Sequence, residues 1–271
     1  MYKDKIKIGI VGCGAIGSNI AKFIDKELKD KVILYALCDL DIKKTKNLIK
    51  KLSSNTKILD IDSLIKESQL IIETASIDAA NYIINKAVKS KKDLIILSVG
   101  VFVKYPEILK TVMDSNLNLY IPSGAICGVD GLGALSLGEI KNITITTSKP
   151  IKGFNNSNYL KEKNIDIDNI KEKKIIFKGD VKDAIRFFPQ NINVAATLLL
   201  ASNFKDIKVC IKLNPNINRN IHHIEIDAKE AKISIDVKNI PSEDNPKTSS
   251  LAILSTKYLL KKMFSSFRVG S

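Results

Sequence analysis

Short apolar runs alternate with amphipathic segments through the first 121 residues. Most of these runs are continuously apolar, which is typical of strands covered on both faces of a parallel sheet. The strands predicted from them are 6–11, 32–38, 57–59, 70–73, 94–97 and 117–121. Between them, apolar positions at helical spacing predict helices at 43–52, 63–67, 77–88 and 106–113. Strands that alternate with helices over short connections predict an α/β fold with a Rossmann-type, doubly wound parallel sheet.

The pattern changes after Pro122, where strand candidates begin to alternate apolar and polar positions. These candidates are 143–147, 207–213, 221–227 and 231–237, and helices are predicted at 132–137, 193–201 and 247–263. The polar segment 150–172 is predicted to be a loop or an insertion. We therefore expect a first domain over residues 1–121 and a second, α+β domain with a mostly antiparallel sheet over residues 122–246. The closing helix within 247–271 is expected to pack back on the first domain.

A glycine-rich turn follows the first strand and opens a helix, with the pattern Gly12-x-Gly14-x-x-Gly17. Gly12 allows the tight turn, Gly14 lets the backbone approach a pyrophosphate, and Gly17 lets helix and strand pack closely. Asp39 closes the second strand, 22 residues past the last glycine. In this context the turn predicts dinucleotide binding, and a turn that serves only packing is the alternative. The contacts predicted here are Gly12, Gly14, Ala15, Ile16, Gly17 and Asp39.

Ligands of doubly wound sheets bind beyond the carboxyl ends of the strands. The other segments that leave these ends are rich in small residues, which suits backbone lying against a flat coenzyme, although loops favour such residues anyway. The further coenzyme contacts predicted from them are Ala75, Ser76, Ser98, Gly100 and Ala125. Asp39 should bond the ribose hydroxyls and repel a 2′-phosphate, which favours NAD. Lys43 and Lys44 lie close enough in sequence to leave NADP open.

The chain has two histidines, and they are adjacent at His222 and His223. Neighbouring residues of a strand point to opposite faces. His222 shares its parity with Ile224 and Ile226, so it should point inward, and His223 should point to water. An inward imidazole is either a hydrogen-bonded core histidine or a catalytic group, and the sequence pattern alone favours the former.

Two polar segments adjoin predicted helices. Asn191 and Asn193 come immediately before an apolar helix, where they serve either as caps or as ligands of a carboxamide such as that of nicotinamide. Asn245, Lys247 and Thr248 lead into the last predicted helix. They either cap that helix or form, with its N–H groups, an anion site that suits a substrate carboxylate.

The composition indicates a globular protein of 271 residues with a formal charge of +14. Its lysines are scattered through every predicted helix, which indicates a solvated surface rather than a nucleic-acid interface. The N-terminal residues lack the apolar core of a signal peptide, and no apolar run is long enough to span a membrane, so a soluble, cytoplasmic protein is expected. The four cysteines are widely spaced, which favours buried free thiols over disulfides or a zinc site, and no metal is expected.

The sequence resembles the L-aspartate dehydrogenase family over nearly its whole length. The glycine loop is common to many nucleotide-binding folds, whereas four later segments, in this order, are quite specific. The segments are Gly12–Gly17, Pro122–Ile126, Phe188–Thr197 (Phe-Pro-x-Asn-x-Asn-Val-Ala-Ala-Thr), Asn220-x-His222 and Asp244–Ser249.

This resemblance implies an NAD(P)-dependent enzyme that oxidises L-aspartate to iminoaspartate. The imine then hydrolyses to oxaloacetate and ammonia, or feeds quinolinate and NAD synthesis through a hand-off to quinolinate synthase. His222 matches the family's catalytic histidine, and Ala125 with one of Asn191 or Asn193 matches its nicotinamide contacts; we favour Asn193. The resemblance thereby reverses the balance at His222 in favour of catalysis. His223 departs from the family, which more often has an acid there, and residues 153–172 match it poorly.

Two other functions remain as alternatives. One is an oxidoreductase of a related diacid pathway, of the dihydrodipicolinate reductase or homoserine dehydrogenase type, which shares the two-domain plan. The order of the Asn-x-Asn, histidine and Asn-Pro-Lys-Thr segments argues against it. The other is a dinucleotide-sensing protein without chemistry, which the inward His222 disfavours. An open antiparallel sheet in the second domain also suggests a homodimer.

Overall fold

The computed structural model describes residues 5–154, 158–167, 169–188 and 193–270. It divides into two compact units. The first comprises Met1–Gly124 together with Ala252–Val269, and the second comprises Ala125–Leu251 together with Gly270–Ser271. Each unit is described below by itself.

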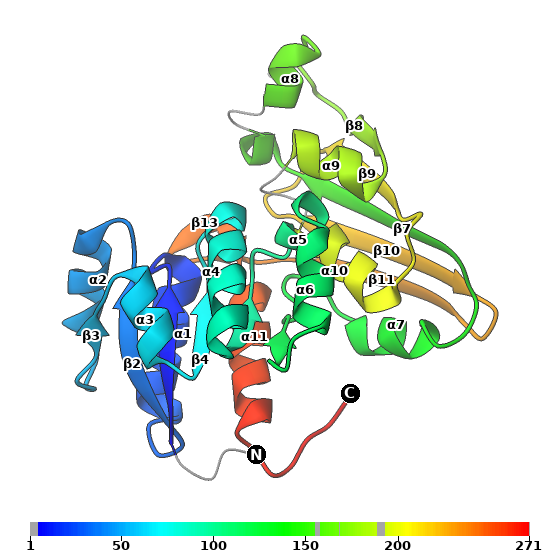
Figure 1. Ribbon diagram of the computed structural model, residues 1–271. Coiled ribbons are helices and arrows are strands. Elements are labelled where there is room, and N and C mark those ends of the chain that lie inside the picture. The colour runs from blue at the N-terminus through cyan, green and yellow to red at the C-terminus, as the bar shows by residue number, and fades with distance from the viewer. Residues whose placement is uncertain (1–4, 155–157, 168, 189–192, 271) are drawn as a thin grey trace. The chain divides into compact units, whose positions relative to one another are not determined.

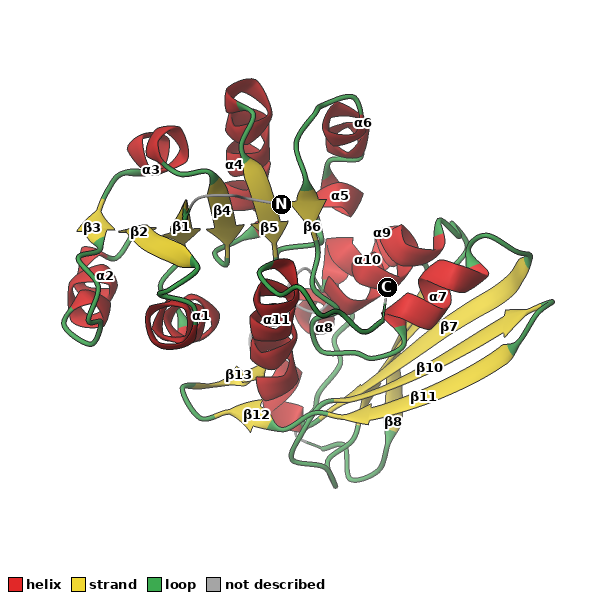
Figure 2. Ribbon diagram, turned by 90° about the horizontal axis from the view of Figure 1, so that it is seen from below, coloured by secondary structure: helices red, strands yellow, loops and turns green. Residues whose placement is uncertain are grey.

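In the described part of the first unit, six parallel strands form a sheet in the order β3-β2-β1-β4-β5-β6. The strands are β1 (Ile6–Val11), β2 (Val32–Cys38), β3 (Lys57–Ile58), β4 (Leu70–Glu73), β5 (Asp93–Ile96) and β6 (Leu119–Tyr120). The helices are α1 (Ala15–Glu27), α2 (Ile42–Ile49), α3 (Ile61–Glu67), α4 (Ile77–Ser90), α5 (Val101–Lys104), α6 (Glu107–Met113) and most of α11 (Ser250–Met263). Helices α1, α2 and α11 cover one face and α3, α4 and α6 the other (Figure 2). The predicted doubly wound parallel sheet is therefore confirmed.

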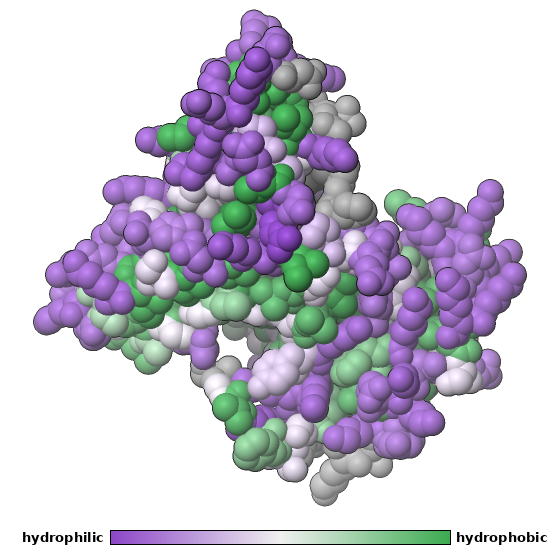
Figure 3. Space-filling model, turned by 180° about the vertical axis from the view of Figure 1, so that it is seen from behind, coloured by the Kyte–Doolittle hydropathy of each residue, from purple (hydrophilic) through white to green (hydrophobic). Residues whose placement is uncertain are grey.

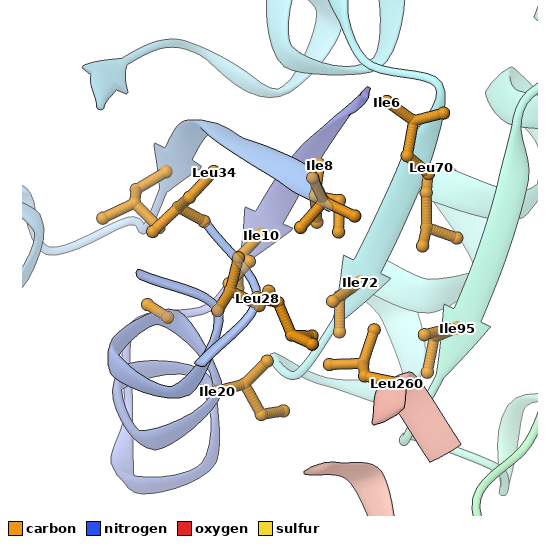
Figure 4. Packing of buried hydrophobic residues seen from close by; sticks show 14 of the residues in the cluster. Ile6, Ile8, Ile10, Ile20, Leu28, Leu34, Leu70, Ile72, Ile95 and Leu260 are labelled. Carbon is orange, nitrogen blue, oxygen red and sulfur yellow. The ribbon is translucent and has the colours of Figure 1, made fainter. Parts of the chain in front are cut away.

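One core cluster of this unit lies between the sheet and the helices of the face that carries α1 and α11. Ile8 and Ile10 of β1 and Ile72 of β4 are fully buried there, as the continuous apolar runs predict. Ile20 of α1 and Leu260 of α11 pack into the same cluster (Figure 4). The last helix is thus part of the core that begins with the first strand.

Two details of this unit differ from the sequence prediction. The last strand covers only Leu119–Tyr120 instead of residues 117–121. The apolar run after β5 continues into a short helix, α5, that was not predicted. Val101 and Phe102 are buried in that helix, so these apolar residues serve helix packing.

The described part of the second unit contains a five-stranded sheet in the order β11-β10-β7-β9-β8. The strands are β7 (Ile140–Lys149), β8 (Lys174–Gly179), β9 (Lys208–Leu213), β10 (Ile221–Ala228) and β11 (Lys232–Lys238). The helices are α7 (Val129–Leu135), the 3₁₀ helix η1 (Ile151–Phe154), α8 (Asn158–Glu162), α9 (Val181–Phe187) and α10 (Asn193–Ser202). Only the β7–β9 pair is parallel among the pairs of this described sheet, so the prediction of a mostly antiparallel sheet is confirmed.

One face of this second sheet is covered by α7, α9 and α10 (Figures 1 and 2). The strands β7 and β10 alternate buried residues on that face with more exposed residues on the other. Strand β8 and helix α9 were not predicted, and the segment 150–172 contains η1 and α8 rather than loop alone. Polar residues between the apolar positions hid these short elements from the periodicity analysis.

The predicted start of the closing helix at Lys247 is wrong. Residues Asn245–Ser249 form strand β13, which pairs with β12 (Pro241–Ser242), and α11 begins only at Ser250. The hydroxyl of Ser249 accepts a hydrogen bond from the N–H of Leu251 at 3.1 Å, so Ser249 caps the helix in place of Asn245 or Thr248.

Hydrophilic residues cover much of the face in Figure 3, with smaller hydrophobic patches among them. No helix among the described residues is long and apolar enough to cross a membrane. All four cysteines are free thiols. The expectation that they are buried is right for Cys13 and wrong for Cys127, which is exposed.

Truncating Leu260 to alanine should lower the free energy of unfolding by about 2–5 kcal/mol, because its fully buried side chain fills the core of the first unit. Urea unfolding measures this change. The matched control is Leu254→Ala on the same helix, where the side chain is 57% exposed and a much smaller loss is expected. Equal losses for the two variants would contradict the assignment of Leu260 to the core.

Candidate active site

The glycine loop has the close approaches that its spacing predicts. Gly12 has a φ of +96°, and its N–H donates to the carbonyl of Cys38 at 2.8 Å. A Cβ added at Gly17 would lie 1.9 Å from the carbonyl oxygen of Gly12, so no other residue fits at position 17. These two glycines therefore fix the turn that joins β1 to α1.

The start of α1 is suited to a phosphate group. Gly14 occupies the cap position, no side chain caps the helix there, and its first turn contains no acidic residue. A Cβ added at Gly14 would have no atom within 4 Å, so the loop is open on the side where a ligand would approach. Ala15 and Ile16 begin the helix, and N–H groups at such a helix start favour anions. The residues present therefore fit the diphosphate of a dinucleotide.

Asp39 lies beside this loop. Its carboxylate accepts hydrogen bonds from the N–H of Cys13 at 2.6 Å and from the N–H of Asp41 at 2.8 Å. Burial raises the pKa of the Cys13 thiol to about 12, and the neighbouring charge of Asp39 adds to that effect. Lys43 and Lys44 lie in the exposed first turn of α2. The structure thus places Asp39 next to the predicted phosphate site, where a ribose is expected.

Sequence reasoning missed Glu73, which joins two of the predicted coenzyme loops. Its fully buried carboxylate accepts from the N–H of Ala75 at 2.7 Å and from the N–H and hydroxyl of Ser98 at 2.9 and 2.8 Å. Burial raises the pKa of Glu73, and these hydrogen bonds oppose that rise. The signal in the sequence was a carboxylate that ends an apolar strand, where a buried charge needs several donors.

The remaining predicted loop residues lie at helix starts. Ser76 caps α4 by accepting from the N–H of Ala79 at 3.2 Å, and Gly100 occupies the cap position of α5. Their structural roles are therefore accounted for without a ligand, whereas Ala75 and Ser98 are held in place by the Glu73 carboxylate.

His222 points inward, as its parity predicts, and is 5% exposed. It lies on β10 directly opposite Thr147 of β7, and its Nδ1 is 3.0 Å from the Thr147 hydroxyl. His223 points to the other face, where its ring nitrogens lie 3.0 Å from Asp236 and 3.5 Å from Glu225. Both orientation predictions are confirmed.

Sequence reasoning also missed Lys149, the last residue of β7. It is 6% exposed, and burial lowers the pKa of its ammonium to about 8. Burial, together with the charge of Lys149, lowers the pKa of His222 to about 4. At neutral pH this lowered pKa leaves the imidazole uncharged, and the neighbouring charge that contributes to the shift is that of Lys149.

Ala125 lies in the same unit and is fixed by Asn239, a further residue that was not predicted. The side-chain amide of Asn239 donates to the Ala125 carbonyl at 2.9 Å, and the Ser249 hydroxyl donates to the oxygen of that amide. Asn239 also donates its backbone N–H to the Asn220 carbonyl at 2.9 Å, just before the strand that carries His222. The buried residue Asn239 therefore joins three segments, which are 122–126, 220–222 and 244–249.

The other predicted residues are less informative. Asn193 begins α10, and its carbonyl accepts from the Thr197 hydroxyl at 2.8 Å. Asn191 lies outside the described residues. Asn245 and Thr248 belong to β13, as does the backbone of Lys247, whose side chain lies outside the description.

Comparisons with known proteins bear on both units. A family model described as aspartate dehydrogenase, C-terminal, matches residues 130–263, and one described as homoserine dehydrogenase, NAD binding domain, matches residues 12–122. The L-aspartate dehydrogenase of Methanosarcina acetivorans is 38% identical over 272 residues, which cover 98% of this chain and 100% of that protein. The L-aspartate dehydrogenase of Methanococcus maripaludis is 38% identical over 270 residues, with the same coverage of both chains.

The chain belongs to the L-aspartate dehydrogenase family. Among solved structures, the aspartate dehydrogenase of Thermotoga maritima has a TM-score of 0.74 and 25% identity, with 98% of this chain and 100% of that chain covered. The resemblance seen in the sequence is thus confirmed. The family model that names homoserine dehydrogenase matches residues 12–122, whereas the model that matches residues 130–263 is that of aspartate dehydrogenase.

The buried imidazole of this family member should make its stability depend on pH. The unfolded chain takes up a proton at His222 below about pH 6.5, whereas the folded chain does so only near pH 4. The contribution of the uncharged His222 to the free energy of unfolding is therefore fully present above pH 6.5 and is lost as the pH drops toward 4. Between pH 7 and 4.5, wild type should lose about 2–3 kcal/mol more than His222→Gln in urea unfolding.

His223→Gln, which retains His222, is the control and should keep the wild-type fall. Identical pH dependence for wild type and His222→Gln would show that the folded protein protonates His222 as easily as the unfolded chain does.

Proposed function

We propose that this protein oxidises L-aspartate to iminoaspartate with NAD(P), and that His222 is its catalytic residue. The observation that carries the proposal is a buried imidazole, held by Thr147, at the position where the sequence matches the family's catalytic histidine. The full-length similarity to proteins named L-aspartate dehydrogenase supports the substrate.

The first unit holds the coenzyme in this proposal. The Gly12–Gly17 loop and the start of α1 bind the diphosphate, Asp39 bonds the ribose, and Glu73 positions the loops that carry Ala75 and Ser98. Ser76 and Gly100 stay predicted contacts of the same loops. When bound, the nicotinamide supplies an acceptor for a hydride, and the protein's residues supply positioning and proton transfer.

His222 acts through its imidazole nitrogens. If Nδ1–H donates to the Thr147 hydroxyl, Nε2 carries the lone pair and accepts a proton. The amine of aspartate must be neutral before hydride leaves its α-carbon, so Nε2 takes a proton from the ammonium, or later activates the water that attacks the imine. In this tautomer Thr147 holds the Nδ1 side of the ring and the imidazole is a base at Nε2.

The remaining site residues are assigned by motif. Ala125 and one of Asn191 or Asn193 contact the nicotinamide, with Asn193 favoured. Asn239 holds the Ala125 carbonyl in place. Asn245, Lys247 and Thr248 contribute to binding a substrate carboxylate. The hydrogen bond from the adjacent Ser249 to Asn239 ties their segment to the one that carries Ala125.

Two wider features complete the proposal. The iminoaspartate feeds NAD synthesis by transfer to quinolinate synthase, since an imine that is not consumed hydrolyses in water.

The subunits form a homodimer through the face of the second sheet that carries His223. The face is partly polar and includes the exposed Ile175, which suits contact with a second copy of the same face.

The substrate assignment predicts NADH formation with L-aspartate, measured as an increase in absorbance, and much slower formation with D-aspartate, L-glutamate or L-homoserine. His222→Ala should lower kcat by at least about 100-fold, because a positioned base contributes on that scale. Its affinity for NAD, measured by titration, should stay within about twofold. A preference for L-homoserine, or wild-type turnover in His222→Ala, would overturn the proposal.

The coenzyme assignment predicts a preference for NAD over NADP, because the Asp39 carboxylate repels a 2′-phosphate. Asp39→Ala should raise KM for NAD and reduce the preference by about tenfold or more. Comparing kcat/KM for both coenzymes in the two proteins measures this. Asp41→Ala is the matched control, since Asp41 caps α2 and should leave the preference largely unchanged. A strong NADP preference in wild type would remove the role given to Asp39.

A further inference from the structure

Lys149 and His222 lie near the same end of two neighbouring strands of the second sheet, and on the same face. Lys149 is the last residue of β7, and His222 is the second residue of β10. Thr147 pairs with His222 directly across these strands. Because alternate residues of a strand share a face, Lys149 projects on the side of the imidazole, two positions beyond Thr147. An ammonium and an imidazole are thereby placed side by side.

The surroundings of Lys149 make a charged side chain unusual there. The other inward residues of β7 include Ile143 and Ile145, and those of β10 include Ile224 and Ile226, all of which are buried. Lys149 is nevertheless 6% exposed, and burying its ammonium costs free energy unless the charge is paired or hydrogen-bonded. The covering helix α10 contains no ionisable residue among its described positions.

We propose that Lys149 binds one carboxylate of the substrate beside His222. The inference rests on the proposed function, in which the substrate is a dicarboxylic amino acid. An ammonium attracts a carboxylate strongly where water is scarce, and the resulting charge-assisted hydrogen bond would orient the substrate amine toward the neighbouring imidazole. Lys149 is then a substrate-binding residue of the second unit, in addition to the 245–248 segment.

The same contact would change the basicity of His222. The helices that cover this face carry Asp130, Lys182, Asp183 and Arg186, yet among the described residues the charge that acts on the pKa of His222 is that of Lys149. A bound carboxylate compensates that charge. The imidazole would therefore become a stronger base when a dicarboxylate is bound, which reserves proton transfer for the loaded site.

Lys149→Met removes the ammonium and keeps an unbranched apolar side chain. KM for L-aspartate should rise by about 10- to 150-fold, the range for losing a hydrogen bond to a charged group, while KM for NAD stays within about twofold. The matched control is Lys141→Met, which changes an exposed lysine on the same strand and should leave both KM values unchanged. An unchanged KM for L-aspartate in a folded Lys149→Met protein would overturn the proposal.

A second measurement does not depend on turnover. Succinate carries two carboxylates and no amine, so it occupies the site without reacting. In the NAD-bound enzyme, NMR titration of the imidazole protons should show that succinate raises the pKa of His222, and that Lys149→Met raises it without succinate. The chain has two histidines, so a His223→Gln background leaves one imidazole to follow. If succinate leaves the pKa of His222 unchanged in the wild-type protein, the proposal is overturned, even if Lys149→Met fails to fold.

The two measurements separate this inference from the proposed function. If the protein does not oxidise L-aspartate but succinate raises the pKa of His222, the inferred carboxylate site stands and the proposed activity is wrong. If the Lys149→Met protein oxidises L-aspartate with the wild-type KM, the proposed activity stands and the inferred carboxylate site is wrong.

Discussion

The antiparallel pairing of β7 with β10 is the constraint on which the chemistry of the second unit depends. It sets Thr147 against His222, fixes which ring nitrogen is held, and brings Lys149 to the same face. A slip of one residue in this register would turn His222 to the other face of the sheet and bring His223 inward in its place. The buried apolar residues of β7 and β10 fix this register, so they determine the geometry of the site as well as the fold.

The first unit solves a different problem, which is to hold backbone loops in place for a large anionic ligand. Two carboxylates do this by accepting backbone hydrogen bonds. Asp39 holds the glycine loop through Cys13, and Glu73 holds the loops after β4 and β5 through Ala75 and Ser98. Asp39 remains near the surface, where it can meet a ribose, whereas Glu73 is fully buried and serves only the protein.

Much of the fold followed from periodicity, because continuous apolar runs and strict alternation report burial directly. The inward position of His222 came from parity alone. Short elements such as α5, β8 and β13 were missed or misplaced, since a few residues carry too little pattern and β13 depends on its partner β12. Glu73, Lys149 and Asn239 were missed for another reason. Their importance comes from burial and from partners distant in sequence, which no local pattern encodes.

The first unit is discontinuous, because its core takes Leu260 from a helix that the chain supplies only after the whole second unit. A ribosome releases the chain from its N-terminus, so the parallel sheet emerges long before the residue that closes one side of it. Until α11 has been synthesised, the apolar surface around Ile20, Ile72 and Ile95 lacks its final cover. Maturation of the nucleotide-binding unit must therefore wait until the second unit and α11 have emerged.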